Sequence, residues 1–171
     1  MKYALFFDLD EAARAALRGA PAAEVEACVV DLLTALEGDS DVDDELLLYS
    51  GHAVSDAGHG TADRPVLDWL AASPSERRLA LAAGFLAGLW SRNAAPPPPS
   101  ALQRLLEACA GRSPRDMGWH LATDLLLRLW RRADLPSPTR DALRAELARH
   151  HAELSQTGGF PRLLETLAAV R

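Results

Sequence analysis

Apolar residues recur along most of this chain with the spacing of amphipathic helices. Between Pro21 and Gly38 they repeat at intervals of three and four residues, which places them on one helical face: Val25, Cys28, Val29, Leu32, Leu33 and Leu36. Proline and glycine delimit further segments of this kind, at about residues 9–18, 65–70, 74–92, 100–110, 114–133, 138–156 and 161–170. Leu and Ala are abundant and Ile is absent, which favours helices over strands. The sequence therefore predicts an all-α fold, a bundle of about eight to nine helices in a single domain, residues 1–171.

The helix boundaries are predicted from capping residues and from breaks in the pattern. Asp8 precedes Glu11 by three residues, the spacing of a capping box, so Asp8 is the expected N-cap of the first helix. Ser73 is the expected N-cap of the helix that ends near residue 92. The apolar start, residues 3–7, predicts either a short strand or a lead into that first helix. Four consecutive prolines predict an extended link within residues 94–100.

A weak repeat with a period of forty residues occupies the second half of the chain. Seven residues of the first copy recur forty positions later. The first copy holds Ala82, Leu86, Leu89, Trp90, Arg92, Pro96 and Pro98, and the second holds Ala122, Leu126, Leu129, Trp130, Arg132, Pro136 and Pro138. The period is similar to that of HEAT-type helical hairpins, and the alternative is two similar hairpins in an ordinary bundle. Either interpretation predicts equivalent packing positions for Trp90 and Trp130.

Small residues recur every four positions at Ala80, Gly84 and Gly88, on a helix flanked by large apolar side chains. Such a stripe lets another helix cross closely, which predicts a central position for this helix. The alternative is a seam between two copies of the chain. The sequence leaves the oligomeric state open.

Charge is divided unevenly between the two halves of the chain. The formal net charge is −11 for residues 1–75 and +5 for the basic helical-hairpin half, residues 76–171. The two halves could pair within the fold, or the acidic half could contact a basic partner. The candidate partner-binding residues are the acidic group Asp39, Asp41, Asp43, Asp44 and Glu45.

The segment from Ser50 to Arg64 is predicted to be the longest loop, because it holds three glycines among polar residues. It also carries most of the candidate metal-ligand or acid/base groups: His52, Asp56, His59 and Asp63. His120 is a further candidate from a different helix. It belongs there to a polar stripe at four-residue steps, which comprises Asp116, His120, Asp124, Arg128 and Arg132. The alternatives are a flexible connection for the segment and a row of helical ion pairs for the stripe. Glu146, His150 and Glu153 share another helical face, where we expect His150 to be partly buried with its polar atoms satisfied.

The N-terminal string Phe6-Phe7-Asp8-Leu9-Asp10 resembles the first motif of the haloacid dehalogenase family of phosphatases. The resemblance implies a nucleophilic role for Asp8 and an acid/base role for Asp10, and it implies a parallel sheet. The family also expects Thr where this chain has Ala12, and a later Lys. The alternative is that Asp8 is only a helix cap, which explains the same residues.

The alternating carboxylates of Asp39, Asp41 and Asp43 resemble the start of an EF-hand calcium loop. The sixth position of that loop is Gly in the family and Asp44 here. The twelfth is a bidentate Glu in the family and Ser50 here. An acidic link between helices is the alternative interpretation.

Several function classes are excluded by composition. The chain has a single lysine, Lys2 at the terminus, so it has none for a Walker loop or a pyridoxal Schiff base. No nucleophile-elbow or dinucleotide motif occurs, so we expect no cofactor. The acidic net charge argues against nucleic acid, and no apolar run is long enough for a membrane span or an export signal. Cys28 and Cys109 fall in apolar helical patterns and are expected to be reduced and buried, which fits a cytoplasmic protein.

The sequence thus favours a non-enzymatic protein–protein interaction module, such as an adaptor, a regulator or a toxin-neutralising partner, which would use an acidic helical surface. The alternative is a small metal-dependent or acid/base enzyme built on the segment from His52 to Asp63.

Overall fold

The computed structural model describes residues 2–39, 44–157 and 160–170, and these form an all-α fold without strands. Nine α-helices are present in the described residues: α1 (Glu11–Gly19), α2 (Ala22–Glu37), α3 (Asp44–Asp56), α4 (Asp63–Ala72), α5 (Glu76–Arg92), α6 (Pro99–Cys109), α7 (Met117–Trp130), α8 (Ser137–Thr157) and α9 (Pro161–Ala168). Two short 3₁₀ helices, η1 (Tyr3–Phe7) and η2 (Gly60–Ala62), accompany them. The predicted fold class is confirmed. None of the described helices has the length and apolar character that a membrane crossing requires.

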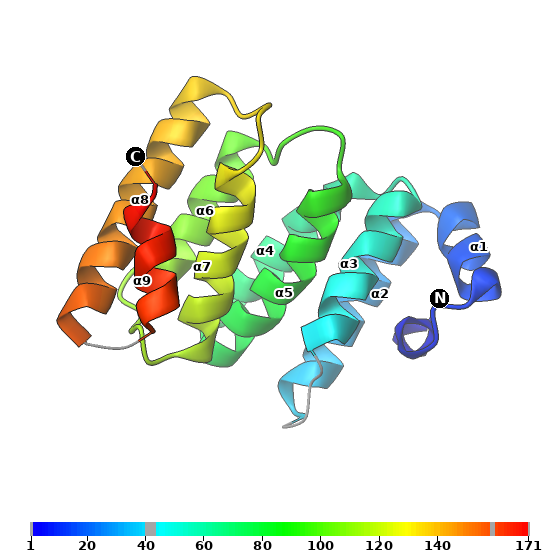
Figure 1. The fold of residues 1–171 in the computed structure, drawn as a ribbon. Helices are drawn as coiled ribbons and strands as arrows, with labels where there is room; N and C mark the ends of the chain where they lie inside the picture. The colour runs from blue at the N-terminus through cyan, green and yellow to red at the C-terminus, as the bar shows by residue number, and fades with distance from the viewer. Residues whose placement is uncertain (1, 40–43, 158–159, 171) are drawn as a thin grey trace.

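The helices stack as antiparallel hairpins in two layers (Figure 1). One layer holds α3, α5, α7 and α9, which all run in the same direction, and the other holds α2, α4, α6 and α8. The α5 helix packs along its length against α3 on one side and α7 on the other, so its predicted central position is confirmed. The forty-residue repeat corresponds to the step from α5 to α7 within one layer.

Glycine allows α3 and α5 to cross with their backbones in contact. A Cβ atom added at Gly88 would lie 2.0 Å from the carbonyl oxygen of Leu48, and one at Gly51 would lie 2.2 Å from that of Phe85. Any larger residue at these points would force the helices apart. The small-residue stripe of α5 therefore serves a close helix crossing, as predicted. A seam between two copies is excluded at Gly88, because α3 of the same chain covers it.

The two tryptophans of the repeat do not pack equivalently, so that prediction is wrong. Trp90 is 0% exposed and donates its indole N–H to Asp63 of α4. Trp130 is half-buried near the first turns of α8, where the guanidinium groups of Arg140 and Arg144 lie 5.2 and 5.4 Å from its ring centroid. Trp90 thus faces α4, whereas Trp130 faces the arginines near the start of α8.

Two predicted helix caps are corrected by the structure. Asp10, not Asp8, caps α1: its Oδ1 accepts a hydrogen bond of 2.8 Å from the backbone N–H of Ala13. Ser75, not Ser73, caps α5, and its Oγ accepts one of 3.0 Å from the N–H of Arg78. Each true cap lies two residues after the predicted one.

The predicted loop from Ser50 to Arg64 is largely helical, so that prediction is also wrong. The α3 helix continues to Asp56, and α4 begins at Asp63. Gly58 has a φ of +90°, which ends the helical path and turns the chain toward η2.

The link between α5 and α6 is shorter than the composition suggested, because Pro99 is already the first residue of α6. Arg132 holds the start of this link. Its guanidinium donates hydrogen bonds of 2.8 Å to the Trp90 carbonyl, 3.1 Å to that of Asn93 and 3.2 Å to that of Ala94. The chain is thereby fixed where it leaves the α5 helix.

The acidic and basic halves contact each other within the fold. Glu37 of α2 pairs with Arg78 of α5 at 2.8 Å, and Asp68 of α4 pairs with Arg104 of α6 at 2.6 Å. Part of the negative charge of the first half is thus paired with positive charge of the second half within the fold.

Candidate functional site

His52 and Asp56 lie on the outer side of α3 rather than in a loop. The Nε2 atom of His52 is 3.0 Å from the Oγ atom of Ser91 on α5, and the ring of Tyr49 lies against it with centroids 6.0 Å apart. Burial lowers the pKa of His52, and the nearby charges of Arg92 and Arg128 lower it further, whereas Asp56 raises it. The local field at His52 is therefore positive on balance.

His59 and Asp63 have structural partners of their own. The Nε2 atom of His59 lies 2.9 Å from the carbonyl oxygen of Leu17, which ties the α3–α4 turn to α1. Asp63 is 6% exposed and accepts a hydrogen bond of 3.3 Å from the indole of Trp90. Burial raises the pKa of Asp63, although the hydrogen bond from Trp90 opposes the shift.

His120 lies on α7, in an aromatic contact apart from the other candidates. Its ring centroid is 5.1 Å from that of Trp119 and 4.4 Å from that of Phe160. Across the described residues, no three His, Cys, Asp or Glu side chains come together in a group that could hold a metal ion. In the polar stripe of α7, Asp124 and Arg128 form the expected i,i+4 ion pair at 2.6 Å.

The predicted acidic contact residues are only partly described. Asp41, Asp43 and the side chain of Asp44 lie outside the described residues. Asp39 and Glu45 are exposed, and the carbonyl oxygen of Asp39 accepts a hydrogen bond from Arg77. The acidic partner-binding surface stays a prediction.

Both family resemblances lose support from the fold. Asp10 caps α1, Asp8 ends η1, and the described residues contain no sheet on which a dehalogenase-type site could be built. Ser50, at the closing position of the EF-hand resemblance, is fully buried, and its hydroxyl donates to the carbonyl of Leu46 at 2.7 Å. It supplies no ligand to the acidic segment.

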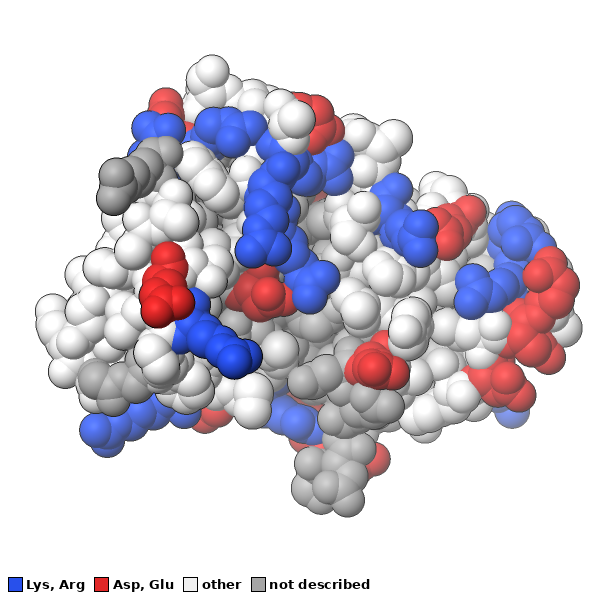
Figure 2. All heavy atoms as spheres, viewed as in Figure 1, with Lys and Arg blue, Asp and Glu red and all other residues white. Residues whose placement is uncertain are grey.

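A surface on α3, α5 and α7 gathers exposed groups of the kind found in binding sites. We name it the three-helix face, and it comprises Tyr49, His52, Ser91, Arg92 and Arg128. Tyr49 is 52% exposed, which is high for so large a side chain. A hollow of about 150 Å³ between α5 and α7 adjoins it, with Ala87, Ser91 and Arg128 in its wall. Figure 2, viewed from this side, shows basic side chains gathered over the upper parts of α5 and α7.

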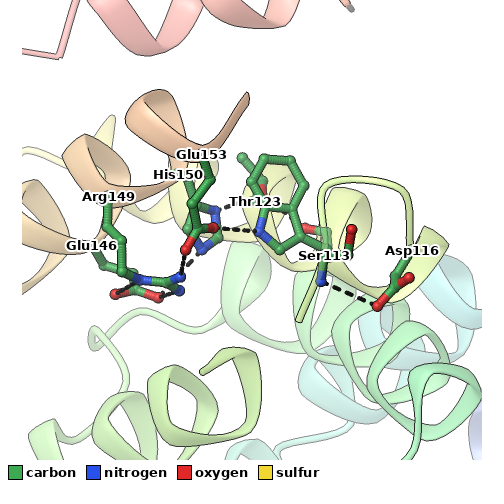
Figure 3. A network of polar contacts seen from close by, with 8 residues as sticks. Ser113, Asp116, Thr123, Glu146, Arg149, His150 and Glu153 are labelled. Carbon is green, nitrogen blue, oxygen red and sulfur yellow. Dashed lines mark hydrogen bonds and ion pairs between the residues drawn. The ribbon is translucent and has the colours of Figure 1, made fainter. Parts of the chain in front are cut away.

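A buried polar network joins α7 to α8 (Figure 3). The sequence predicted only the α8 side of this network, namely Glu146, His150 and Glu153. His150 is 0% exposed, with Nδ1 at 2.7 Å from the Thr123 hydroxyl and Nε2 at 3.2 Å from a Glu146 oxygen. Arg149 bonds both Glu146 and Glu153, and Glu153 accepts from the indole of Trp119 at 3.3 Å. The expectation of a partly buried His150 with satisfied polar atoms is corrected in both parts. The ring is fully buried and stacks on Trp119 with centroids 4.5 Å apart, and its Nε2 has no hydrogen-bond partner among the described residues.

The order Thr123, His150, Glu146 matches that of a nucleophile, a base and an orienting acid. Thr123 is itself 0% exposed, however, and its hydroxyl donates to the Trp119 carbonyl at 2.7 Å. A substrate has no access to that hydroxyl. The network therefore stabilises the α7–α8 contact and supplies no catalytic site.

Comparison of the chain with protein-family models, curated proteins and solved structures found no match. Of the surfaces described, the three-helix face combines exposed aromatic and cationic groups on rigid helices.

Proposed function

We propose that this chain is a non-enzymatic protein-interaction module that binds an acidic segment of a partner protein on its three-helix face. The observation that carries the proposal is the convergence of Tyr49, Arg92 and Arg128 from three parallel helices around His52. Tyrosine and arginine are the residues that most often dominate binding energy at protein interfaces. Arg128 already pairs with Asp124 in an exposed ion pair, so the attraction for carboxylates of a partner comes from Arg92 together with the part of the Arg128 charge that this pair leaves.

The packing of α5 supports such a role. Ala87 and Ser91 are the small α5 residues in the wall of the hollow between α5 and α7, so a partner side chain could enter there. Close glycine-mediated crossing also holds α3 and α5 in a fixed relation. A binding surface on rigid elements loses little conformational entropy when a partner binds.

The enzyme alternative has weaker support. His52, His59, Asp63 and His120 each contact a different neighbour, namely Ser91, the Leu17 carbonyl, Trp90 and Phe160. A general acid/base pair needs its groups within hydrogen-bond reach of one reacting centre. Alanine at His52 is therefore expected to affect partner binding rather than any turnover.

The experiment is affinity capture from a lysate of the source cells, with captured proteins identified by mass spectrometry. Reversing Arg92 and Arg128 to Glu together should reduce capture of a specific protein at least tenfold, and raised salt should weaken capture of the same protein by the wild type. The matched control is Arg18→Glu on α1, an exposed arginine outside the face. Circular dichroism would confirm that each variant folds.

Equal capture by wild type and the Arg92/Arg128 variant, or no capture above a blank matrix, would contradict the proposal. A loss confined to the Asp39→Asn/Glu45→Gln variant would instead assign binding to the acidic surface that the sequence predicts.

A further inference from the structure

Two adjoining cavities meet at Asp63, on the side of the fold where η2, α4 and the link from α5 to α6 come together. They measure about 450 and about 590 Å³, and both are lined by Thr61, Asp63 and Pro98. The smaller one, here named the Asp63 cavity, extends along the link from Asn93 to Pro98. Cavities of several hundred Å³ with a few convergent polar groups are typical of small-molecule sites.

The Asp63 cavity has a simple electrostatic character. Asp63 is the one ionisable residue in its described wall, where the remaining polar side chains are the neutral Ser55, Thr61 and Asn93. Its carboxylate is almost fully buried, and the one side chain that donates to it is the neutral indole of Trp90. Burial outweighs the stabilising charge of Arg104 and raises the pKa of Asp63, so a cation that reaches this carboxylate through the cavity gains a strong contact.

The other charged groups of the larger cavity lie outside the Asp63 cavity. Glu26, Arg64 and Arg104 line it beside Asp63. Arg104 forms an ion pair with Asp68 at 2.6 Å. Neither arginine lines the Asp63 cavity itself.

We propose that the Asp63 cavity binds an aliphatic ammonium group, with Asp63 as its counter-ion and the hydroxyls of Ser55 and Thr61 as additional acceptors. An ammonium group has three N–H donors and no acceptor, which suits a wall of carboxylate and hydroxyl oxygens. The proline and alanine residues of the link then contact the aliphatic part of the ligand. This site is separate from the three-helix face and does not depend on its function.

The wall is held in place before a ligand enters. The hydroxyl of Ser55 donates to Asn93 Oδ1 at 2.6 Å, and Asn93 Nδ2 donates to the Gly60 carbonyl at 3.2 Å. Arg132 also holds the link through a hydrogen bond to the Asn93 carbonyl. A preformed wall reduces the entropy lost on binding.

The test is isothermal titration of the full chain with putrescine, with 1,4-butanediol as the uncharged analogue and Nα-acetyl-lysine methylamide as the mimic of a peptide lysine. We expect wild type to bind the diamine, to bind the diol at least tenfold more weakly, and to lose at least tenfold in diamine affinity on Asp63→Asn. Asp56→Asn, the same change at an exposed position nearby, should leave affinity unchanged. Stronger binding of the lysine mimic would identify a protein side chain as the ligand, and stronger binding of putrescine a free amine.

A measurement on wild type alone keeps the proposal testable if Asp63→Asn does not fold. Burial raises the pKa of Asp63, and the groups that face it are Trp90, Glu26, Arg64 and Arg104. Below that pKa the bound amine must displace a proton, so affinity should fall by up to about tenfold per pH unit and titrations in two buffers should report proton release. Affinity equal for Asp63→Asn and wild type, pH-independent binding without proton release, or no binding of either amine at millimolar concentration would overturn the proposal.

Discussion

Gly88→Ala is expected to lower the free energy of unfolding by about 2–3 kcal/mol, although alanine is the better helix former. The new Cβ would lie 2.0 Å from the Leu48 carbonyl oxygen and 3.0 Å from the His52 nitrogen, both of them backbone atoms. A backbone contact cannot be relieved by a rotamer change, so α3 and α5 must separate. Urea unfolding followed by circular dichroism should show a lower midpoint with an unchanged m-value.

Gly19→Ala is the matched control, because a Cβ there meets no atom within 4 Å at the end of α1. We expect it to leave stability unchanged or to raise it by up to about 1 kcal/mol. Gly51→Ala should resemble Gly88→Ala, and the double variant should lose less than the sum because both disturb one crossing. An unaltered unfolding midpoint for Gly88→Ala would show that α3 and α5 are not in backbone contact.

The helical core could be predicted because it depends on local periodicity. The buried positions of α2 are those that the sequence singled out, from Val25 to Leu36. The caps could not be decided locally, since Asp8 and Asp10 both precede a plausible first turn. Burial of Phe6 in η1 makes Asp8 the end of that element and leaves Asp10 to cap α1.

The segment around Gly51 was mispredicted because glycine has two roles. Composition indicates a loop, but this glycine is a contact point in the middle of α3. A helical period was present, since Leu47, Ser50 and Val54 are all buried on that helix. The matching stripe of α5 was recognised because three small residues repeat there, whereas α3 offers a single glycine whose meaning depends on the partner helix.

The candidate site residues could be selected by type but not paired. His150 was placed on its helical face with Glu146, because that spacing is local. Its contact with Thr123 joins residues 27 positions apart on another helix, and no sequence period encodes it. Asp63 was likewise selected as a loop ligand, whereas tertiary packing makes it a buried carboxylate against Trp90.

Because Glu146 stabilises the α7–α8 contact in its ionised form, the stability of that contact depends on pH. Burial opposes ionisation, but the close approach of His150 and the hydrogen bonds from Arg149 outweigh it and lower the pKa of Glu146 to about 2, from an ordinary 4.5. Because the folded-state pKa lies below the unfolded one, the stabilisation is complete above pH 4.5 and is lost as the pH falls toward 2. A shift of this size corresponds to roughly 3 kcal/mol, so the urea midpoint should fall steeply over this interval.

Glu146→Gln should therefore cost about 3 kcal/mol at pH 7 and should flatten the pH dependence between 4.5 and 2. The amide keeps the size of the side chain but leaves Arg149 with one carboxylate partner, Glu153, and deprives His150 of a charged neighbour. Glu11→Gln, which breaks the exposed pair with Arg18, should change the midpoint little and keep the full acid dependence. If Glu146→Gln instead lost stability with acid as steeply as wild type, other carboxylates would have to carry the effect, and the buried network would owe its stability to packing against Trp119 rather than to charge.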